Sequence, residues 1–298
     1  MEIRRIALIL IIIFLSLTVL FYSLYRKEAV NKTLLTEEFV AGAVQNLKSS
    51  GVAVSADDIE RTIPEKDIYV FEVPTVNAHH EKITQAISKV VFGGNATTAS
   101  FDTPEGISVG IYDSENESKE LGRVVFSDAT LTFNFSKKGV NVSGASSAIL
   151  NNDINIITET HRSVIESILQ ELSYDNAAFR YAGASSNEEY VIITAMQEIG
   201  GHDIHDVYIN FIFHGDEVID ISGKWIVEKV SAEYHNQLVD GVNVLYRLDL
   251  ENISSIKNER LVYFLRKSDN NRYFIIPGWE ITYTDKTGKL LTAYFNAL

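Results

Sequence analysis

Two closely spaced histidines are the first residues to test for chemistry. His202 and His205 occur in the segment GGHDIHDV, where two aspartates accompany them. A spacing of three would place both imidazoles on one side of a helix, as in a metal site. The preceding Gly200-Gly201 pair instead predicts a turn, and no Glu follows His202 as in the HExxH motif. We therefore interpret both histidines as solvent-exposed loop residues and expect no metal site.

The sequence motifs of nucleophilic and nucleotide chemistry are also missing. Ser254 and Lys257 have the Ser-x-x-Lys spacing, but they fall in a polar segment without partner motifs, so we predict a chance match in a loop. No GxSxG elbow, phosphate-binding loop or GxGxxG turn occurs. The acidic segment 113–120 lacks the alternating oxygen ligands and the Gly of a calcium loop. We expect no catalytic residue, no cofactor and no metal.

The composition narrows the function classes further. The chain contains no Cys, which excludes disulfides, zinc–thiolate sites, iron–sulfur clusters and thiol catalysis. Hydrophobic residues make up 46% of the chain, so a packed core is expected. Without residues 1–28, 22 Lys plus Arg stand against 38 Asp plus Glu, a net charge near −16. Such a domain should repel nucleic acid and anionic lipid, because both attract proteins through cations.

An uncharged apolar run near the N-terminus predicts a membrane-spanning helix. Residues 6–25 have two cations on each flank, and fourteen of them are Leu, Ile, Val or Phe. Twenty helical residues rise about 30 Å, the thickness of the hydrocarbon core of a bilayer. The bulky end of the run offers no small-residue cleavage site, so residues 1–28 predict an uncleaved signal anchor rather than a removed signal peptide. The short Arg-containing tail would stay in the cytoplasm, which predicts a single-pass protein of the cell membrane with an extracytoplasmic C-terminal domain.

Residues 29–150 predict a first extracytoplasmic α+β unit. Apolar residues at three- and four-residue steps indicate helices over 34–48 and 80–92. Short β-rich runs bounded by turn residues indicate strands at 68–73, 97–101, 107–112, 122–126 and 130–135.

Residues 151–298 predict a second unit of similar organisation. Helices are expected over 153–172 and 239–250. Strands are expected at 179–182, 189–198, 207–214, 218–230, 261–267, 273–283 and 290–295. The predicted fold is therefore α+β: one N-terminal transmembrane helix, followed by two similar helix-plus-antiparallel-sheet units that meet near residues 145–152.

The last predicted hairpin contains an unusual strand. Pro277 and Trp279 lie in its middle, and Pro is tolerated in a strand only at an edge or a bulge. We therefore expect the strand to bend at Pro277 and Trp279 to cover a core. After a turn at 285–288, the return strand would carry Tyr294 and lead to Asn296.

This pattern resembles the YycI/YycH family of membrane-anchored two-component-system regulatory proteins of low-GC Gram-positive bacteria. Its members end in a hairpin of the approximate form Pro-x-Trp-x-hydrophobic, then Tyr-hydrophobic-Asn-Ala, and Pro277, Trp279, Tyr294 and Asn296 match it. The anchor and the first helix are also similar in layout. Extracytoplasmic repeat domains of the PepSY type end in a similar way. The chain departs from the family where it stops after Leu298, since a Gly-containing turn is often seen there.

The resemblance implies regulation rather than catalysis. It implies a non-enzymatic accessory protein that modulates a sensor histidine kinase of a cell-wall two-component system. The expected partners are the membrane, that kinase and a paralogous accessory protein. Contacts within the membrane would involve Ser16, Thr18 and Ser23, because small and hydroxyl residues mediate helix packing in lipid. Simple tolerance of small hydroxyls in a lipid-facing helix is the alternative for each of them.

Two other functions stay open. One is a PepSY-like extracytoplasmic module that binds a peptide or a protease. An exposed apolar groove would support that function. The other is a cell-surface hydrolase that uses carboxylates or the pair His202 and His205.

Overall fold

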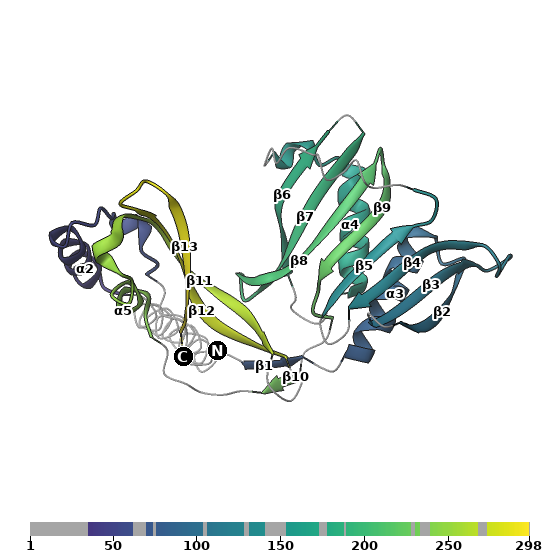
Figure 1. Cartoon of the computed structure of the whole chain (residues 1–298), viewed down its shortest axis with the longest axis horizontal. Coiled ribbons are helices and arrows are strands. Elements are labelled where there is room, and N and C mark those ends of the chain that lie inside the picture. The colour runs from purple at the N-terminus through teal and green to yellow at the C-terminus, as the bar shows by residue number, and fades with distance from the viewer. Residues whose placement is uncertain are drawn as a thin grey trace, which may run out of the picture. The chain divides into compact units, whose positions relative to one another are not determined.

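The structure, a computed structural model, has the predicted α+β class (Figure 1). None of its described helices is both long and apolar enough to span a bilayer, and the predicted span, residues 6–25, lies outside the described residues. The described residues are 35–61, 70–73, 76–103, 106–127, 131–140, 153–172, 178–187, 189–227, 230–232, 239–267 and 273–297.

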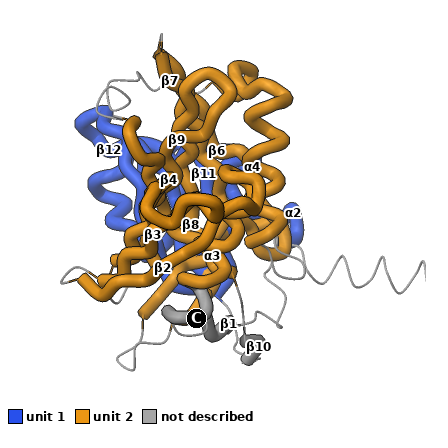
Figure 2. Tube along the Cα trace, turned by 90° about the vertical axis from the view of Figure 1, so that its right-hand side faces the viewer, with its two compact units in different colours: residues 1–68, 235–261, 278–298 blue, residues 69–234, 262–277 orange. Residues whose placement is uncertain are grey.

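The chain divides into two compact units, each built from separate stretches of sequence (Figure 2). Unit 1 comprises residues 1–68, 235–261 and 278–298, and unit 2 comprises residues 69–234 and 262–277. The expected joint near residues 145–152 falls in a segment, 141–152, that lies outside the described residues. Each of the two predicted units, residues 29–150 and 151–298, contributes residues to both compact units.

Unit 2 is organised around eight antiparallel strands in the order β2-β3-β4-β5-β9-β8-β7-β6. Helix α3 (Val76–Val91) precedes the first four strands in sequence, and helix α4 (Glu159–Leu172) precedes the other four. The last strands of the two meanders, β5 and β9, join them edge to edge. The strands are β2 (Ala96–Thr103), β3 (Gly106–Asp113), β4 (Glu120–Ser127), β5 (Thr132–Lys137), β6 (Ala178–Ser186), β7 (Tyr190–Ile199), β8 (His202–His214) and β9 (Glu217–Lys224).

Both helices cover the same face of this sheet (Figure 1). In α4, Ile165, Ile168, Leu169 and Leu172 recur at helical spacing and are fully buried, so they form the face that meets the sheet. The strands contribute alternate residues, such as Phe133 and Phe135, to the same core. Helix α3 packs on α4, and Lys89 of α3 forms a 2.7 Å ion pair with Glu171 of α4.

Helix α4 begins later than the periodicity of residues 153–172 predicts. Residues Ile154–Ile156 form a separate 3-10 turn. Thr158 then caps α4, because its Oγ1 accepts a hydrogen bond of 3.2 Å from the His161 amide. The expected helix over 239–250 is likewise reduced to α5 (Gly241–Leu245) and a 3-10 turn at Leu250–Asn252.

Strands β1 and β10 and parts of β11 and β12 complete unit 2. Strand β1 (Val70–Val73) pairs antiparallel with β10 (Val230–Ala232) and with the beginning of β12 (Tyr273–Asp285). Strand β11 (Ile253–Lys267) runs parallel to β8, where Tyr263 is paired with Ile204. Strands β11 and β12 contribute residues to both units.

Unit 1 joins segments from both ends of the chain around one core. Helix α2 (Glu37–Ser49) buries Val40, Ala43 and Leu47. These side chains pack in one cluster with residues of α5, β11 and β12, among them Val244, Ile256 and Trp279. Strand β13 (Leu290–Asn296) pairs with β12 from Gly278↔Asn296 to Thr284↔Leu290.

Pro277 lies where β12 changes its partner. Between described residues, β12 pairs with β1 up to Ile275 and with β13 from Gly278 onward. Pro277 therefore lies between the β12 residues that pair with β1 and those that pair with β13. Two residues later, Trp279 is fully buried, and its indole N–H donates a 2.8 Å hydrogen bond to the Val239 carbonyl.

Candidate functional site

The structure separates the two histidines considered for metal binding. His202 and His205 lie in β8, so the expected loop is wrong. Strand β8 is irregular here, with Asp206 at a φ of +62°, and the His202 ring lies beside Tyr263, with centroids 6.3 Å apart. The His205 ring packs edge-on against Phe264, with centroids 5.6 Å apart. In the part of the chain that is described, no cluster of three potential ligands is present.

Ser254 and Lys257 are also strand residues, because β11 begins at Ile253. The predicted loop is therefore wrong here too. The Ser254 hydroxyl donates to the carbonyl oxygens of Thr284 and Asp285 at 3.0 and 2.9 Å. Its hydrogen bonds hold β11 against the end of β12, whereas Lys257 is exposed.

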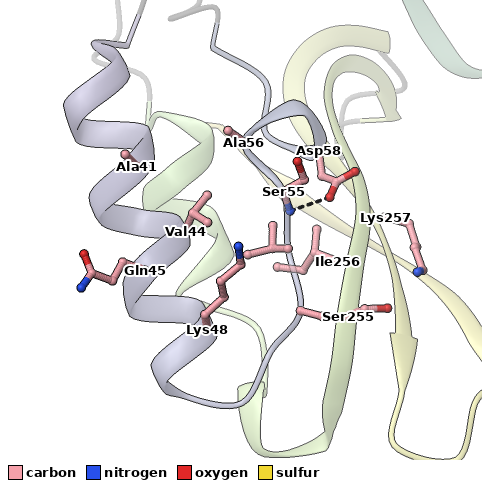
Figure 3. A pocket seen from close by; sticks show the side chains of 12 residues that line it. Ala41, Val44, Gln45, Lys48, Ser55, Ala56, Asp58, Ser255, Ile256 and Lys257 are labelled. Carbon is pink, nitrogen blue, oxygen red and sulfur yellow. Dashed lines mark hydrogen bonds between the residues drawn. The ribbon is translucent and has the colours of Figure 1, made fainter.

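A groove in unit 1, lined by described residues, has a volume of about 700 Å³ (Figure 3). This volume is within the range of small-ligand and peptide sites. Four residues of α2 form one wall at helical spacing, and an extended segment after α2 forms the floor with β11. The lining residues are Ala41, Val44, Gln45, Lys48, Ala53, Val54, Ser55, Ala56, Asp58, Ser255, Ile256 and Lys257.

The floor of the groove is fixed by backbone hydrogen bonds. The Ala53 amide donates to the Ser254 carbonyl, and the Ile256 amide donates to the Ala53 carbonyl, both at 2.9 Å. The segment after α2 thus lies parallel to β11 as a short added strand. Val54 and Ile256 are buried beneath the groove and belong to the unit 1 core. A floor of this kind gives the groove a defined shape.

The polar groups of the groove differ in whether they already have a partner within the fold. Asp58 accepts a 2.7 Å hydrogen bond from the Ser55 amide in a capping box, so its carboxylate is already used within the fold. Lys48 extends from α2 toward the floor (Figure 3). Neither Lys48 nor Lys257 forms an ion pair with any residue that the structure describes. The groove therefore offers cationic groups in a strongly acidic protein.

Buried polar groups of unit 2 serve the fold instead. Arg180 donates two hydrogen bonds to Asp203, at 2.7 and 2.6 Å, and Gln197 bridges the backbone of Ile226. Burial lowers the pKa of His80, whose ring packs against Phe126. Burial also raises the pKa of Asp220, although a hydrogen bond from Ser136 opposes that shift. These groups have partners and line no cavity described here.

Sequence reasoning missed the groove. Its residues are ordinary alanines, valines, serines and lysines, and the walls come from positions 41–58 and 255–257. The only available signal was the spacing 41, 44, 45 and 48 on α2, a second helical stripe beside the buried one. Of the residues singled out from the sequence, Pro277, Trp279, Tyr294 and Asn296 lie on β12 and β13, and Ser16, Thr18 and Ser23 lie outside the described residues.

Comparisons with known proteins give no family. No protein-family model matches the chain, and no curated protein sequence matches it. Among solved structures, an uncharacterized protein from Eubacterium rectale ATCC 33656 aligns with 83% of this chain and 87% of its own. The sequence identity is 6% and the TM-score is 0.46.

Proposed function

We propose that this chain is a non-enzymatic, membrane-anchored extracytoplasmic accessory protein that modulates a sensor histidine kinase of a cell-wall two-component system. In this proposal the unit 1 groove holds an acidic, extended segment of the kinase outside the membrane. The observation that carries it is the open groove beside α2, with its unpaired Lys48. The resemblance of the C-terminal hairpin to the YycI/YycH family supports the choice of partner.

The groove is close to the predicted membrane anchor along the chain. Tyr25 ends the predicted span, and α2 begins at Glu37. Twelve Cα–Cα steps reach at most roughly 40 Å when fully extended. With such an anchor, the beginning of α2 lies within that distance of the bilayer surface, where the extracytoplasmic part of a membrane kinase begins. This reach favours a membrane partner over a distant soluble one.

Charge favours an acidic occupant. The chain carries a net charge of −14, so an acidic segment would be repelled by most of its surface. In the groove, Lys48 and Lys257 are available to carboxylates of the partner. Complementary charge chiefly provides orientation and specificity, while the apolar floor excludes water. An extended peptide of a few residues fits these two requirements.

The predicted membrane segment and the two similar halves of unit 2 also belong to the proposed function. Within the bilayer, Ser16, Thr18 and Ser23 would contact the kinase or a paralogous accessory protein. In unit 2, α3 with β2–β5 and α4 with β6–β9 have the same order of elements, and we interpret them as two copies of one helix-plus-sheet motif.

Site-specific photocrosslinking tests the partner. A benzoylphenylalanine at Gln45, on the rim of the groove, should crosslink in cells to the extracytoplasmic segment of a histidine kinase, identified by mass spectrometry. The matched control is Phe39, an exposed position on another face of α2, which should not capture the kinase. Capture of a peptide or a protease at Gln45 would instead support the PepSY-like module. Equal crosslinking at both positions would contradict the groove as the docking site.

A further inference from the structure

Glu259 is a buried carboxyl group of unit 1. It lies on β11 within unit 1, two residues after Lys257 of the groove, and is 2% exposed. Neither of its side-chain oxygens has a hydrogen bond of ordinary geometry. An ionised carboxylate in such a place would be strongly disfavoured, because burial removes its hydration. This position therefore favours a neutral, protonated side chain.

Glu259 packs directly against the start of α5. A Cβ atom added to Gly241 would lie 2.5 Å from Glu259 Oε1, so the absence of a side chain at Gly241 makes room for the carboxyl group. This contact joins β11 to the segment that begins at Val239. Any group that enlarges or hydrates Glu259 would push these two elements apart.

The charged groups that face Glu259 are acidic. Glu60 follows the 3-10 turn at residues 56–58, and Asp240 is the N-cap of α5, where it accepts hydrogen bonds from Asn243 at 2.9 and 2.7 Å. On β11 itself, the neighbouring Arg260 is paired with Glu280 at 2.7 Å. No cation in the described surroundings acts on the Glu259 carboxyl group.

These surroundings favour the protonated form. Burial raises the pKa of Glu259 to about 8, and the charges of Glu60 and Asp240 act in the same direction. The backbone amide of Glu60 opposes the shift, without reversing it. The pKa of the same side chain in an unfolded chain is close to 4.5.

We infer that Glu259 is a proton-operated latch: its protonated side chain keeps residues 35–61 packed against residues 239–261, and its ionisation loosens them. Glu60 belongs to the first of these segments, and Glu259 and Asp240 belong to the second. The same two segments form the walls of the groove, so loosening them opens the groove as well. The latch concerns the stability of unit 1 and does not depend on what occupies the groove.

The sign of the pH dependence follows from proton binding. Between pH 4.5 and about 8, native unit 1 holds a proton on Glu259 that the unfolded chain has released. The stabilisation is therefore complete below pH 4.5, declines as the pH rises toward 8, and is lost above it. Other acidic groups that titrate below pH 5 change stability in a different range.

The two tryptophans of the chain provide separate reporters. Trp279 is fully buried in unit 1 and Trp225 is fully buried in unit 2. We would follow thermal unfolding of the full-length protein in detergent by Trp279 fluorescence in a Trp225→Phe background. The melting temperature of unit 1 should fall by roughly 10 °C or more between pH 5 and pH 8.5. In a Trp279→Phe background, the Trp225 transition should change much less.

Substitution of Glu259 tests whether this side chain causes the pH dependence of the unit 1 melting temperature. Glu259→Gln should flatten the dependence of the Trp279 transition on pH, whereas Glu251→Gln, an exposed change in the same unit, should leave it as in the parent. Glu259→Met is a second neutral variant of similar size, in case the Gln variant does not fold. If neutral variants retain the parental slope, or if the Trp225 transition shifts equally, the latch is refuted.

Discussion

At the scale of single residues, two Arg–carboxylate pairs of unit 2 show how burial changes the value of a charge. Arg180 donates two hydrogen bonds to Asp203, whose side chain is 4% exposed. Arg123 makes comparable contacts with Glu120, at 2.8 and 2.7 Å, but the Glu120 side chain is 14% exposed and also pairs with Lys138 at 3.1 Å. The bonds look alike, yet water can replace the partner more easily in the second pair.

We predict that Arg180→Met destabilises unit 2 by about 3 kcal/mol, because it leaves the Asp203 charge buried without its partner. Arg123→Met is the matched control and should cost less than about 1 kcal/mol. Urea unfolding followed by Trp225 fluorescence measures both effects. Equal losses in the two variants would show that burial of Asp203 does not govern the value of its ion pair.

The groove gives a second prediction at this scale. Lys48→Glu should weaken binding of the acidic kinase segment about three- to tenfold, since it replaces an attraction by a repulsion. Lys286→Glu introduces the same charge change at an exposed turn of unit 1 and should have little effect. Fluorescence anisotropy with the segment captured at Gln45 provides the affinities. Tighter or unchanged binding to the Lys48 variant would speak against an acidic occupant.

At the scale of elements, the eight-stranded sheet depends on a close approach between β8 and β9. Gly223 is paired with Ile209 on β8 and with Phe133 on β5. Its φ is +148°, and an added Cβ would lie 2.1 Å from the Tyr208 carbonyl oxygen. Backbone atoms cannot move aside as a side chain can. This glycine therefore permits the strand order that unites the two meanders.

We expect Gly223→Ala to destabilise unit 2 by more than about 3 kcal/mol, from strain and from lost strand pairing. Gly215→Ala, in the turn between β8 and β9, has a φ of +58° but open space, and should cost only about 1 kcal/mol. Trp225 fluorescence during urea unfolding distinguishes them. A mild effect at Gly223 would mean that β8 and β9 can separate locally at little cost.

At the scale of the whole molecule, the proposed regulatory function depends on attachment of the chain to the membrane. The proposed function requires the predicted anchor at residues 6–25, since the groove must meet a membrane partner. The acidic remainder offers no electrostatic attraction to anionic lipid. In the proposed function, attachment to the membrane therefore depends on the predicted apolar span.

Replacing residues 1–28 by a cleavable secretion signal tests this dependence. The released protein should fold, because both described cores lie after residue 35, but it should no longer change the output of the kinase. A kinase-dependent reporter gene measures the output. Full regulation by the released form would remove the need for an anchor.

Most elements could be predicted because their signals are local. The expected strand at 107–112 is observed as Gly106–Asp113, and the expected helix at 34–48 as Glu37–Ser49. The predictions are wrong where polar residues interrupt the apolar pattern of a strand. Residues 202–206 and 253–260 belong to β8 and β11, although charged and hydroxyl residues interrupt their apolar pattern. Strand pairing overrode that local composition.

The class of the fold, most of its helices and strands, its acidic charge and the apolar run that predicts an anchor could all be recognised from the sequence. Each of these depends on composition or on a period of a few residues. The tertiary structure alone decided that β5 meets β9, that residues 35–61 and 239–261 share a core, and that Glu259 is enclosed beside Glu60. Such features arise from contacts between segments far apart in the chain, where burial rather than local pattern sets the free energy.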